Sequence, residues 1–406
     1  MADFQRDQDI VAYEGFSGIR NDVLPQRMTH ADLAVAQNID IDETGGIKRR
    51  AGRTSVYGGN VRSLWSDGAQ ALFVEGTNLK RLNPDYTATT LRTGLTPLQA
   101  MAYQGVNDAV YFANGRETGV VQGGLARSWG LPMGSVPGVT VTVGNMPAGD
   151  YQFTQTYFRN DGQESGAGLA GRIRIAAGSG LVFAMPISTD PGVTNKAMYL
   201  TTPNGDVLYQ AGIMTNNTTS FTYQNDSSEL ALPLTTQFMG PPPAGHLVGY
   251  YYGRMYVAVG SDLFYSEPYA YELFDRRKYL SFDSRITMFA PVSSENSRDN
   301  AGIFLGTERS TTWLAGEGPE DFKAVAGPNY GAVMGAMDYV DGSMFTDGSS
   351  GARMLPMWMS TRGICVGLAG GMVQNVTQAR YQISASGSGC ALFKPDSTQF
   401  VAVANS

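Results

Sequence analysis

Short apolar and aromatic runs, separated by turn residues, dominate the hydrophobic pattern of this chain. Almost every such run is about four to seven residues long and lies between Gly, Asn, Asp or Pro residues, a pattern typical of β-strands joined by tight turns. The exception is 29-THADLAVAQN-38, where Thr29 at the cap position predicts a turn or two of helix. The pattern predicts an all-β protein.

A weak internal repeat runs through these predicted strands. Six segments align on two residues, usually hydrophobic, followed by Phe and a turn, although Val257 replaces Phe in the third: 71-ALFVEG-76, 110-VYFANG-115, 255-MYVAVG-260, 302-GIFLGT-307, 343-SMFTDG-348 and 391-ALFKPD-396. Their third residues are separated by 39, 145, 47, 41 and 48 positions. Four of these intervals match the ~40–50-residue period of a β-propeller blade, which predicts a propeller of about six blades. The alternative is that any all-β protein repeats strand, turn and strand.

The long interval predicts an inserted domain. It exceeds one blade period by about 95 residues, the size of one β-sandwich, and the segment 137–234 lies between the Pro/Gly-rich stretches 132-PMGSVPG-138 and 240-GPPPAG-245. Alternating strands and an Asn-Gly turn within it predict an immunoglobulin- or fibronectin III-like sandwich. We therefore expect N-terminal blades in 1–136, the insertion in 137–234 and the remaining blades in 235–406.

Composition narrows the classes of function. The net charge of −7 and pI near 5.0 argue against an overall field that attracts nucleic acid. Cys365 and Cys390, with His30 and His246 far away in sequence, form no zinc pattern, and we expect free thiols and no metal or cofactor. The acidic N-terminus lacks the apolar core of a signal peptide, and no run is long enough to span a membrane.

Catalytic motifs are not evident. A propeller glycosidase needs paired carboxylates, and Glu267, Glu272 and Asp275 are candidates whose separation the sequence does not give. The Gly-rich 366-VGLAGG-371 lacks the lysine of a phosphate-binding loop. We expect a protein that is not an enzyme, with a glycosidase as the remote alternative.

Two basic clusters are the candidate contact residues. In 38-NIDIDETGGIKRRAGR-53, Ala51 stands where a calcium loop needs its closing carboxylate, so a hairpin with a turn at 42–46 is predicted instead. Its outgoing strand carries Lys48, Arg49, Arg50 and Arg53, and a second cluster, Arg276, Arg277 and Lys278, is expected in a loop. The cations are interpreted as a solvated edge, a contact with a neighbouring subunit or a contact with DNA phosphates.

Two stretches carry a family resemblance. The segments 14-EGFSGIRNDVLPQRM-28 and 33-LAVAQNIDIDETGGIKRRAGRTSVYGG-59 resemble the N-terminal segment that precedes a β-propeller in virion proteins of short-tailed bacteriophages. The later 108-DAVYFANG-115 with 129-WGLP-132 is similar to a second motif of these proteins. The resemblance covers about the first 135 residues and points to the tail nozzle, or tail tubular protein B, class.

The resemblance implies a structural role in a virion tail assembled in the bacterial host cytoplasm. In that class six copies form a ring below the head-to-tail adaptor, and viral DNA leaves through its centre. The implied partners are further copies of the chain, the adaptor, tail fibre or spike proteins, and DNA bound without sequence specificity. An acidic lumen would repel DNA and let it slide. The alternative is a tail protein that binds host-surface carbohydrate through the inserted sandwich or a propeller face.

Overall fold

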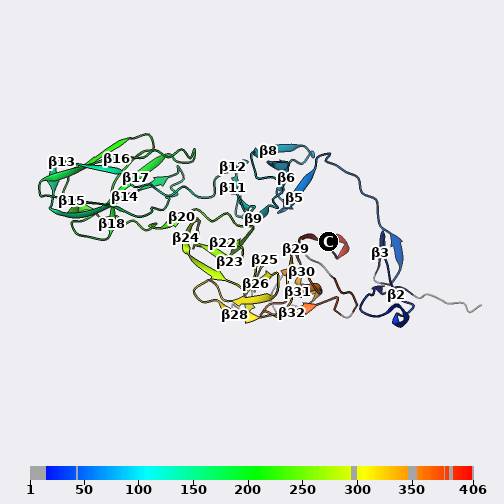
Figure 1. The fold of residues 1–406 in the computed structure, drawn as a ribbon. Coiled ribbons are helices and arrows are strands. Elements are labelled where there is room, and N and C mark those ends of the chain that lie inside the picture. The colour runs from blue at the N-terminus through cyan, green and yellow to red at the C-terminus, as the bar shows by residue number, and fades with distance from the viewer. Residues whose placement is uncertain are drawn as a thin grey trace, which may run out of the picture. The chain divides into compact units, whose positions relative to one another are not determined.

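The computed structural model describes residues 15–42, 44–293, 300–345, 354–378, 380–383 and 387–404 (Figure 1). Small antiparallel sheets make up this part of the chain, and no α-helix occurs in it. The 3-10 turns that lie wholly in the described residues are η1 (Pro25–Arg27), η2 (Ser227–Glu229), η4 (Gly342–Met344) and η5 (Pro395–Ser397). The all-β prediction is confirmed. No helix in these ranges is long and apolar enough to cross a membrane.

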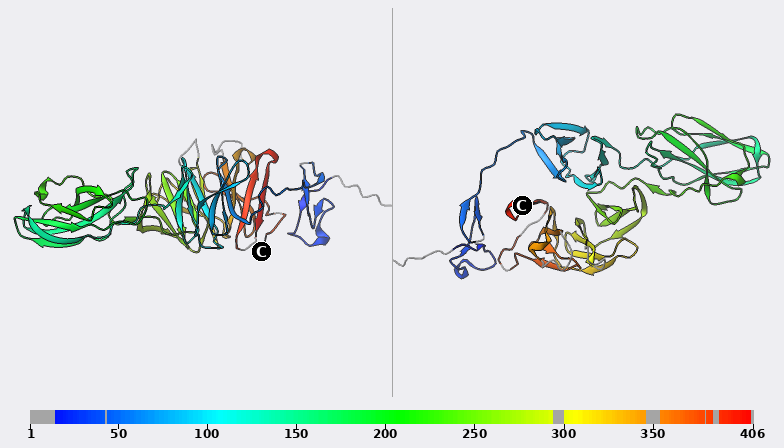
Figure 2. Two further views of the ribbon diagram at one scale, coloured as in Figure 1. Left: turned by 90° about the horizontal axis from the view of Figure 1, so that it is seen from above. Right: turned by 180° about the vertical axis from the view of Figure 1, so that it is seen from behind.

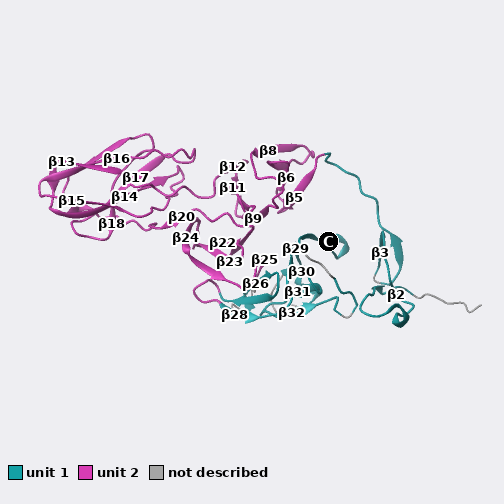
Figure 3. Cartoon of the chain, in the orientation of Figure 1, with its two compact units in different colours: residues 1–58, 292–316, 323–406 teal, residues 59–291, 317–322 magenta. Residues whose placement is uncertain are grey.

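The chain divides into two compact units (Figure 3). Unit 1 comprises residues 1–58, 292–316 and 323–406, and unit 2 comprises residues 59–291 and 317–322. The predicted boundaries at 136/137 and 234/235 separate propeller blades from an inserted domain. The division into two units does not test these boundaries, and they stay a prediction.

Three sheets of unit 2 contain a four-stranded antiparallel meander, in which each strand pairs with the next one along the chain, and the third sheet adds a short strand at one edge. The first has the order β5-β6-β7-β8, the second β12-β11-β10-β9 and the third β20-β24-β23-β22-β21. Their strands are β5 (Val61–Ser66), β6 (Ala71–Glu75), β7 (Asn78–Leu82), β8 (Ala88–Arg92), β9 (Ala102–Val106), β10 (Ala109–Ala113), β11 (Thr118–Gln122), β12 (Leu125–Arg127), β20 (Met239–Gly240), β21 (Leu247–Tyr251), β22 (Arg254–Val259), β23 (Asp262–Glu267) and β24 (Ala270–Ser281).

Strand β10 shows how these sheets stack. Successive side chains of a strand point to opposite faces. Val110 and Phe112 pack into a core with Leu72 of β6, whereas Tyr111 and Ala113 pack into a second core with the third sheet. Because both faces of β10 are covered, its sequence is apolar throughout rather than alternating.

Residues between β12 and β20 form two further sheets around one core. The orders are β13-β16-β19 and β15-β14-β17-β18. Tyr151, Phe153, Leu181, Phe183 and Met198 from both sheets share the core. The strands are β13 (Gly138–Met146), β14 (Gly149–Phe158), β15 (Gly171–Ile175), β16 (Ser179–Ala184), β17 (Asn195–Thr201), β18 (Leu208–Thr215) and β19 (Ser220–Tyr223).

The C-terminal part of the chain forms two more antiparallel meanders and then a smaller sheet. Two more four-stranded sheets have the orders β25-β26-β27-β28 and β29-β30-β31-β32, whereas β33-β34 has two strands (red in Figure 2). The strands are β25 (Ile286–Val292), β26 (Gly302–Thr307), β27 (Thr311–Ala315), β28 (Lys323–Ala326), β29 (Ala332–Asp341), β30 (Met354–Ser360), β31 (Gly363–Gly367), β32 (Val373–Asn375), β33 (Gly389–Lys394) and β34 (Gln399–Ala404).

The predicted repeat coincides with one strand position in successive sheets. Its first four segments form β6, β10, β22 and β26, each the second strand of a four-stranded meander, which for β22 comprises β21 to β24. The sixth segment is β33. The fifth, 343–348, was wrong: Met344 ends η4, residues 346–348 lie outside the described residues, and the equivalent second strand is β30. The fully buried Trp358 of β30 contacts Phe304 of β26.

The predicted helix at 29–38 is also wrong. Asp32 and Leu33 form β2 (Asp32–Leu33), which pairs in parallel with β1 (Gly18–Ile19). The Asp32 carboxylate accepts hydrogen bonds from the backbone and hydroxyl of Thr29 at 2.9 and 2.8 Å. Thr29 therefore closes a turn around Asp32 rather than capping a helix, because a short acidic side chain competes for local backbone donors.

Candidate functional site

The first basic cluster lies on the predicted hairpin. β3 (Ile39–Ile41) pairs antiparallel with β4 (Ile47–Arg49), so that Ile41 faces Ile47 across the pair. Asp42 holds the turn by accepting hydrogen bonds from the Thr44 hydroxyl, the Thr44 amide and the Gly46 amide at 2.7, 3.0 and 2.8 Å. These bonds, the Thr44 hydroxyl first, lower the pKa of Asp42. The hairpin prediction is confirmed.

The four cations of this hairpin are not equivalent. Arg50 forms an ion pair with Asp40, with Nε and Oδ1 3.0 Å apart. Lys48, Arg49 and Arg53 are exposed. Together with Lys394, Gln399 and Val401, the segment from Arg50 to Arg53 and Asp40 line a cavity of about 200 Å³. The lining of this cavity carries three cations and one anion, so its net charge is positive.

The second cluster was placed wrongly in a loop. Arg276, Arg277 and Lys278 lie within β24, on its exposed stretch. Arg277 makes two 2.8 Å contacts with the carboxylate of Asp275, and Lys278 lies 3.3 Å from Glu267. Arg276 donates to the carbonyl of Pro241 at 3.2 Å. All three cations of the second cluster are therefore in contact with residues of unit 2. The first cluster, in contrast, belongs to unit 1.

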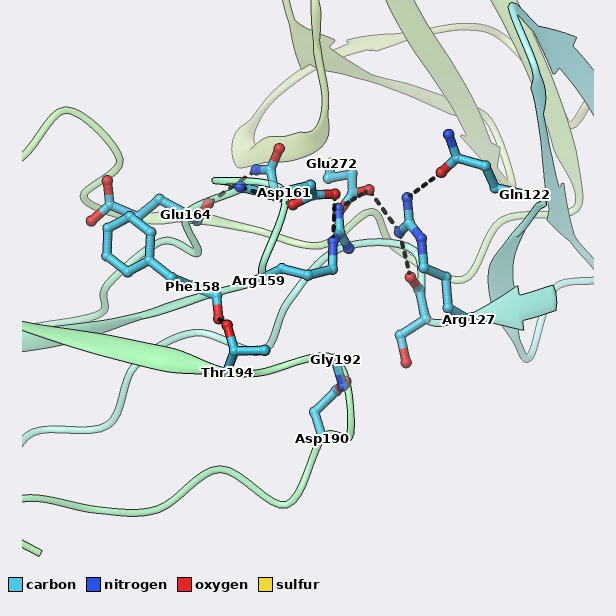
Figure 4. Close-up of polar contacts among 12 residues, drawn as sticks. Gln122, Arg127, Phe158, Arg159, Asp161, Glu164, Asp190, Gly192, Thr194 and Glu272 are labelled. Carbon is cyan, nitrogen blue, oxygen red and sulfur yellow. Dashed lines mark hydrogen bonds and ion pairs between the residues drawn. The ribbon is translucent and has the colours of Figure 1, made fainter. Parts of the chain in front are cut away.

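A buried ion-pair network in unit 2 was not predicted (Figure 4). Arg127 of β12 and Arg159, which follows β14, both donate to Oε1 of Glu272 on β24, at 2.7 and 2.8 Å. The side chains of Arg159 and Glu272 are 9% and 6% exposed. Arg159 also contacts Asp161 at 2.8 Å. One carboxylate thus joins two sheets to the segment that follows β14.

The charges of this network stabilise one another. Burial alone would lower the pKa of Arg159, but the hydrogen bond and charge of Glu272, with those of Asp161, outweigh burial and raise it. Burial would likewise raise the pKa of Asp161, and its contacts with Gln163 and Arg159 lower it. The pairing thus favours the charged forms of Arg159 and Asp161, and Arg159 meets the requirement that a buried ion is paired and hydrogen-bonded.

The motif 129-WGLP-132 lies beside this network. Trp129 is fully buried, stacks at a tilt on Tyr111 with ring centroids 5.0 Å apart, and donates from Nε1 to the carbonyl of Tyr271 at 2.8 Å. Gly130 has a φ of +87°, and a Cβ there would come within 3.0 Å of the Glu272 carbonyl oxygen. Burial of one large side chain contributes roughly 1.5–3 kcal/mol. This motif has a packing role, which accounts for its residue types.

The carboxylates considered for glycoside hydrolysis are all engaged by cations. Glu267 contacts Lys278, Glu272 contacts Arg127 and Arg159, and Asp275 contacts Arg277. In the described ranges, no group of three or more His, Cys, Asp and Glu residues is arranged to hold a metal ion. Cys365 is buried and Cys390 exposed, and both thiols are free.

Comparison with known proteins gives distant structural likenesses. No protein family profile matches the chain, and no curated protein does. Among solved structures, the N-terminal domain of Nup159 aligns over 74% of this chain and 73% of its own, with 9% identity and a TM-score of 0.28. The extracellular domain of BT4673 from B. thetaiotaomicron aligns over 87% and 58%, with 10% identity and a TM-score of 0.23. PorZ of Porphyromonas gingivalis aligns over 88% and 52%, with 14% identity and a TM-score of 0.21. Superpositions this loose carry no argument about function.

Proposed function

We propose that this protein is a structural component of a short bacteriophage tail, in which copies of the chain form a ring that conducts DNA during ejection. The observation that carries the proposal is the N-terminal motif, which spans the β3–β4 hairpin, together with the second motif at β10 and 129-WGLP-132. Both resemble virion proteins of the tail nozzle class, and no enzyme motif accompanies them.

The proposed fold is a β-propeller with an inserted β-sandwich. Successive four-stranded meanders that share cores through strands such as β10 support the propeller, since each blade of a propeller buries its faces against its neighbours. Two sheets around one core between β12 and β20 support the sandwich. A propeller with a protruding sandwich provides the two unlike surfaces that a heterologous ring contact needs.

The exposed cations of the hairpin are the proposed ring contact. Lys48, Arg49 and Arg53 are exposed in a chain whose net charge is −7. A basic patch on an acidic molecule favours association with the acidic surface of the next copy, and it raises the rate of association more than the final affinity. The ring that results would present acidic surface to DNA, so DNA would pass without tight binding.

Negative-stain electron microscopy of the purified full chain tests this proposal. The expected particle is a ring with a central hole about as wide as duplex DNA, since the duplex must pass through it. Arg53→Glu should reduce the fraction of rings, whereas the matched charge reversal Arg309→Glu, at an exposed residue outside both clusters, should not. Monomers or trimers that bind lipopolysaccharide would instead favour the host-binding alternative, and would overturn the ring.

A further inference from the structure

Strand β13 is an open edge in the region between β12 and β20. The sheet has the order β13-β16-β19, so one side of β13 pairs with β16 and the other side has no strand beside it among the described residues. β13 is 9 residues long, and its sequence 138-GVTVTVGNM-146 contains no charged residue and no proline. A long edge of this kind is a template for pairing with another chain.

The valines of β13 face the core side of the sheet, but Val141 and Val143 are not covered there. Val139 lies opposite Phe183 and Val141 opposite Leu181, and both partners are fully buried. Val139 packs against that core, whereas Val141 and Val143 are 55% and 80% exposed. The facing sheet therefore ends before it covers the last two valines, and an apolar strip is left at the edge.

The neighbouring sheet protects its own edge. Strand β15, at one end of the order β15-β14-β17-β18, carries Arg172 and Arg174, and the side chain of Arg174 is 84% exposed. Exposed cations on an edge strand prevent another strand from pairing there. Because β15 has this protection and β13 does not, the edge of β13 is suited to being covered in the assembled protein.

The sequence of β13 specifies the partner. Residues 139–143 read Val-Thr-Val-Thr-Val, which is the same in both directions about Val141. Two copies in antiparallel register about Val141 place Val139 opposite Val143 and Thr140 opposite Thr142, so every cross-strand pair is Val–Val or Thr–Thr. Such pairs of like β-branched residues stabilise a sheet, and no like charges meet. A contact of this symmetry is isologous.

We propose that the β13 edge joins two copies of this chain through an antiparallel β13–β13 pair centred on Val141. The pairing extends two three-stranded sheets into one six-stranded sheet, and it covers the exposed valines of each copy with those of the other. It goes beyond the proposed ring, because neighbours in a cyclic ring meet through heterologous surfaces and a two-fold contact lies outside that set.

The pairing has a limited length. The carbonyl of Val143 accepts a hydrogen bond from the Gln224 side chain at 2.7 Å, and the amide of Asn145 donates to the Gln224 carbonyl at 2.8 Å. The strand register is irregular between Val143 and Met146. Residue 224 thus holds the end of β13, and the free edge is 139–142 with the side chain of Val143.

Cysteine crosslinking in the full chain tests the register. The background is Cys390→Ser, because Cys390 is the exposed native thiol. Opposed residues of an antiparallel pair have Cα atoms about 4.5–5.5 Å apart, within the range of a disulfide. Val141→Cys should therefore give a disulfide-linked dimer under mild oxidation. Val143→Cys should not, because two copies of residue 143 lie roughly 14 Å apart in this register.

Sedimentation supplies the second readout. Val141→Lys should abolish the two-fold association, whereas Ile213→Lys, an exposed apolar residue on the edge strand β18 of the other sheet, should leave it intact. Absence of a Val141→Cys dimer, equal crosslinking of Val141→Cys and Val143→Cys, or persistence of the association in Val141→Lys would each overturn the proposal. Rings without this crosslink would leave the proposed function standing and remove the β13 pairing alone.

Discussion

Two groups of arginines in this protein show how burial decides what a charge does. Arg127 and Arg159 converge on the buried Glu272 and join two sheets of unit 2 to the segment after β14. Arg49 and Arg53, on and after the β3–β4 hairpin, point into solvent. The side chains are chemically the same, and their surroundings differ.

The difference lies in what removal of one partner leaves behind. At Glu272 the loss of one carboxylate leaves Arg127 without its anion and the buried Arg159 with only the exposed Asp161, and such poorly compensated charge is costly. At the hairpin water replaces any lost contact at little cost. Buried arginines should therefore affect stability, and exposed ones assembly. Variants that remove one residue from each group test that division.

The largest effect is expected at Glu272. Glu272→Ala should reduce the free energy of unfolding by about 3–5 kcal/mol, since it breaks a buried ion pair from one side. Chemical denaturation followed by tryptophan fluorescence measures this, because Trp129 lies next to the network. The control Glu320→Ala removes an exposed carboxylate that pairs with Arg254, and should cost about 0–1 kcal/mol. Equal losses in both variants would remove the distinction between buried and exposed pairs.

The next largest loss of stability is expected at Gly130, where the cause is backbone geometry and not charge. Gly130→Ala places a Cβ within 3.0 Å of Pro241 and of the Glu272 carbonyl in a left-handed conformation, with an expected loss of about 1–3 kcal/mol. Gly94→Ala is the matched control, because Gly94 has a φ of +75° and nothing within 4 Å of its Cβ position. The excess loss at Gly130, measured by thermal unfolding, isolates the close packing at this junction from the backbone term.

The strands and the hairpin could be predicted from sequence because their signals are local. Segments 71–76 and 110–115 contain the short continuous apolar runs of buried strands, and the turn after Asp42 uses residues with known turn chemistry. The helix at 29–38 failed for a related reason: Asp32 and Thr29 have a local alternative to the helix, and spacing alone does not weigh it.

The Glu272 network has no local signal. Its members Arg127 and Arg159 are 145 and 113 residues from Glu272 in the chain, so only the fold brings them together. The basic run at 276–278 has a local signal, but that signal led to a wrong prediction. A run of cations was interpreted as a loop, but an exposed stretch of the long strand β24 accommodates it, with Asp275 and Glu267 as partners. Charge indicates exposure, and it does not distinguish a loop from a strand.

The contribution of Asp32 to the stability of the chain is expected to depend on pH. Hydrogen bonds, those from Thr29 first, lower the pKa of Asp32 to about 2. Because the folded pKa lies below the unfolded value, the stabilisation is present above the unfolded pKa of about 4 and is lost as the pH falls toward about 2. Asp32→Asn should lower the stability of the chain at neutral pH, and the difference from wild type should shrink on acidification through this window. Unfolding measured at several pH values checks this, and a difference that stays constant would contradict it.

The smallest effect on stability is expected at the cations of the β3–β4 hairpin, which are exposed. Arg50→Ala removes one exposed pair with Asp40 and should cost about 0–1 kcal/mol, while Arg49→Ala and Arg53→Ala should fall within about 0.5 kcal/mol of wild type. Their effect should instead be on assembly, with a salt dependence, because exposed charges are screened within about 8 Å at physiological ionic strength. Light scattering at low and high salt, alongside denaturation of the same samples, separates the two effects. A large loss of stability with unchanged assembly would place these arginines with Arg127 and Arg159, as fold-stabilising residues, and would leave the proposed ring without its contact.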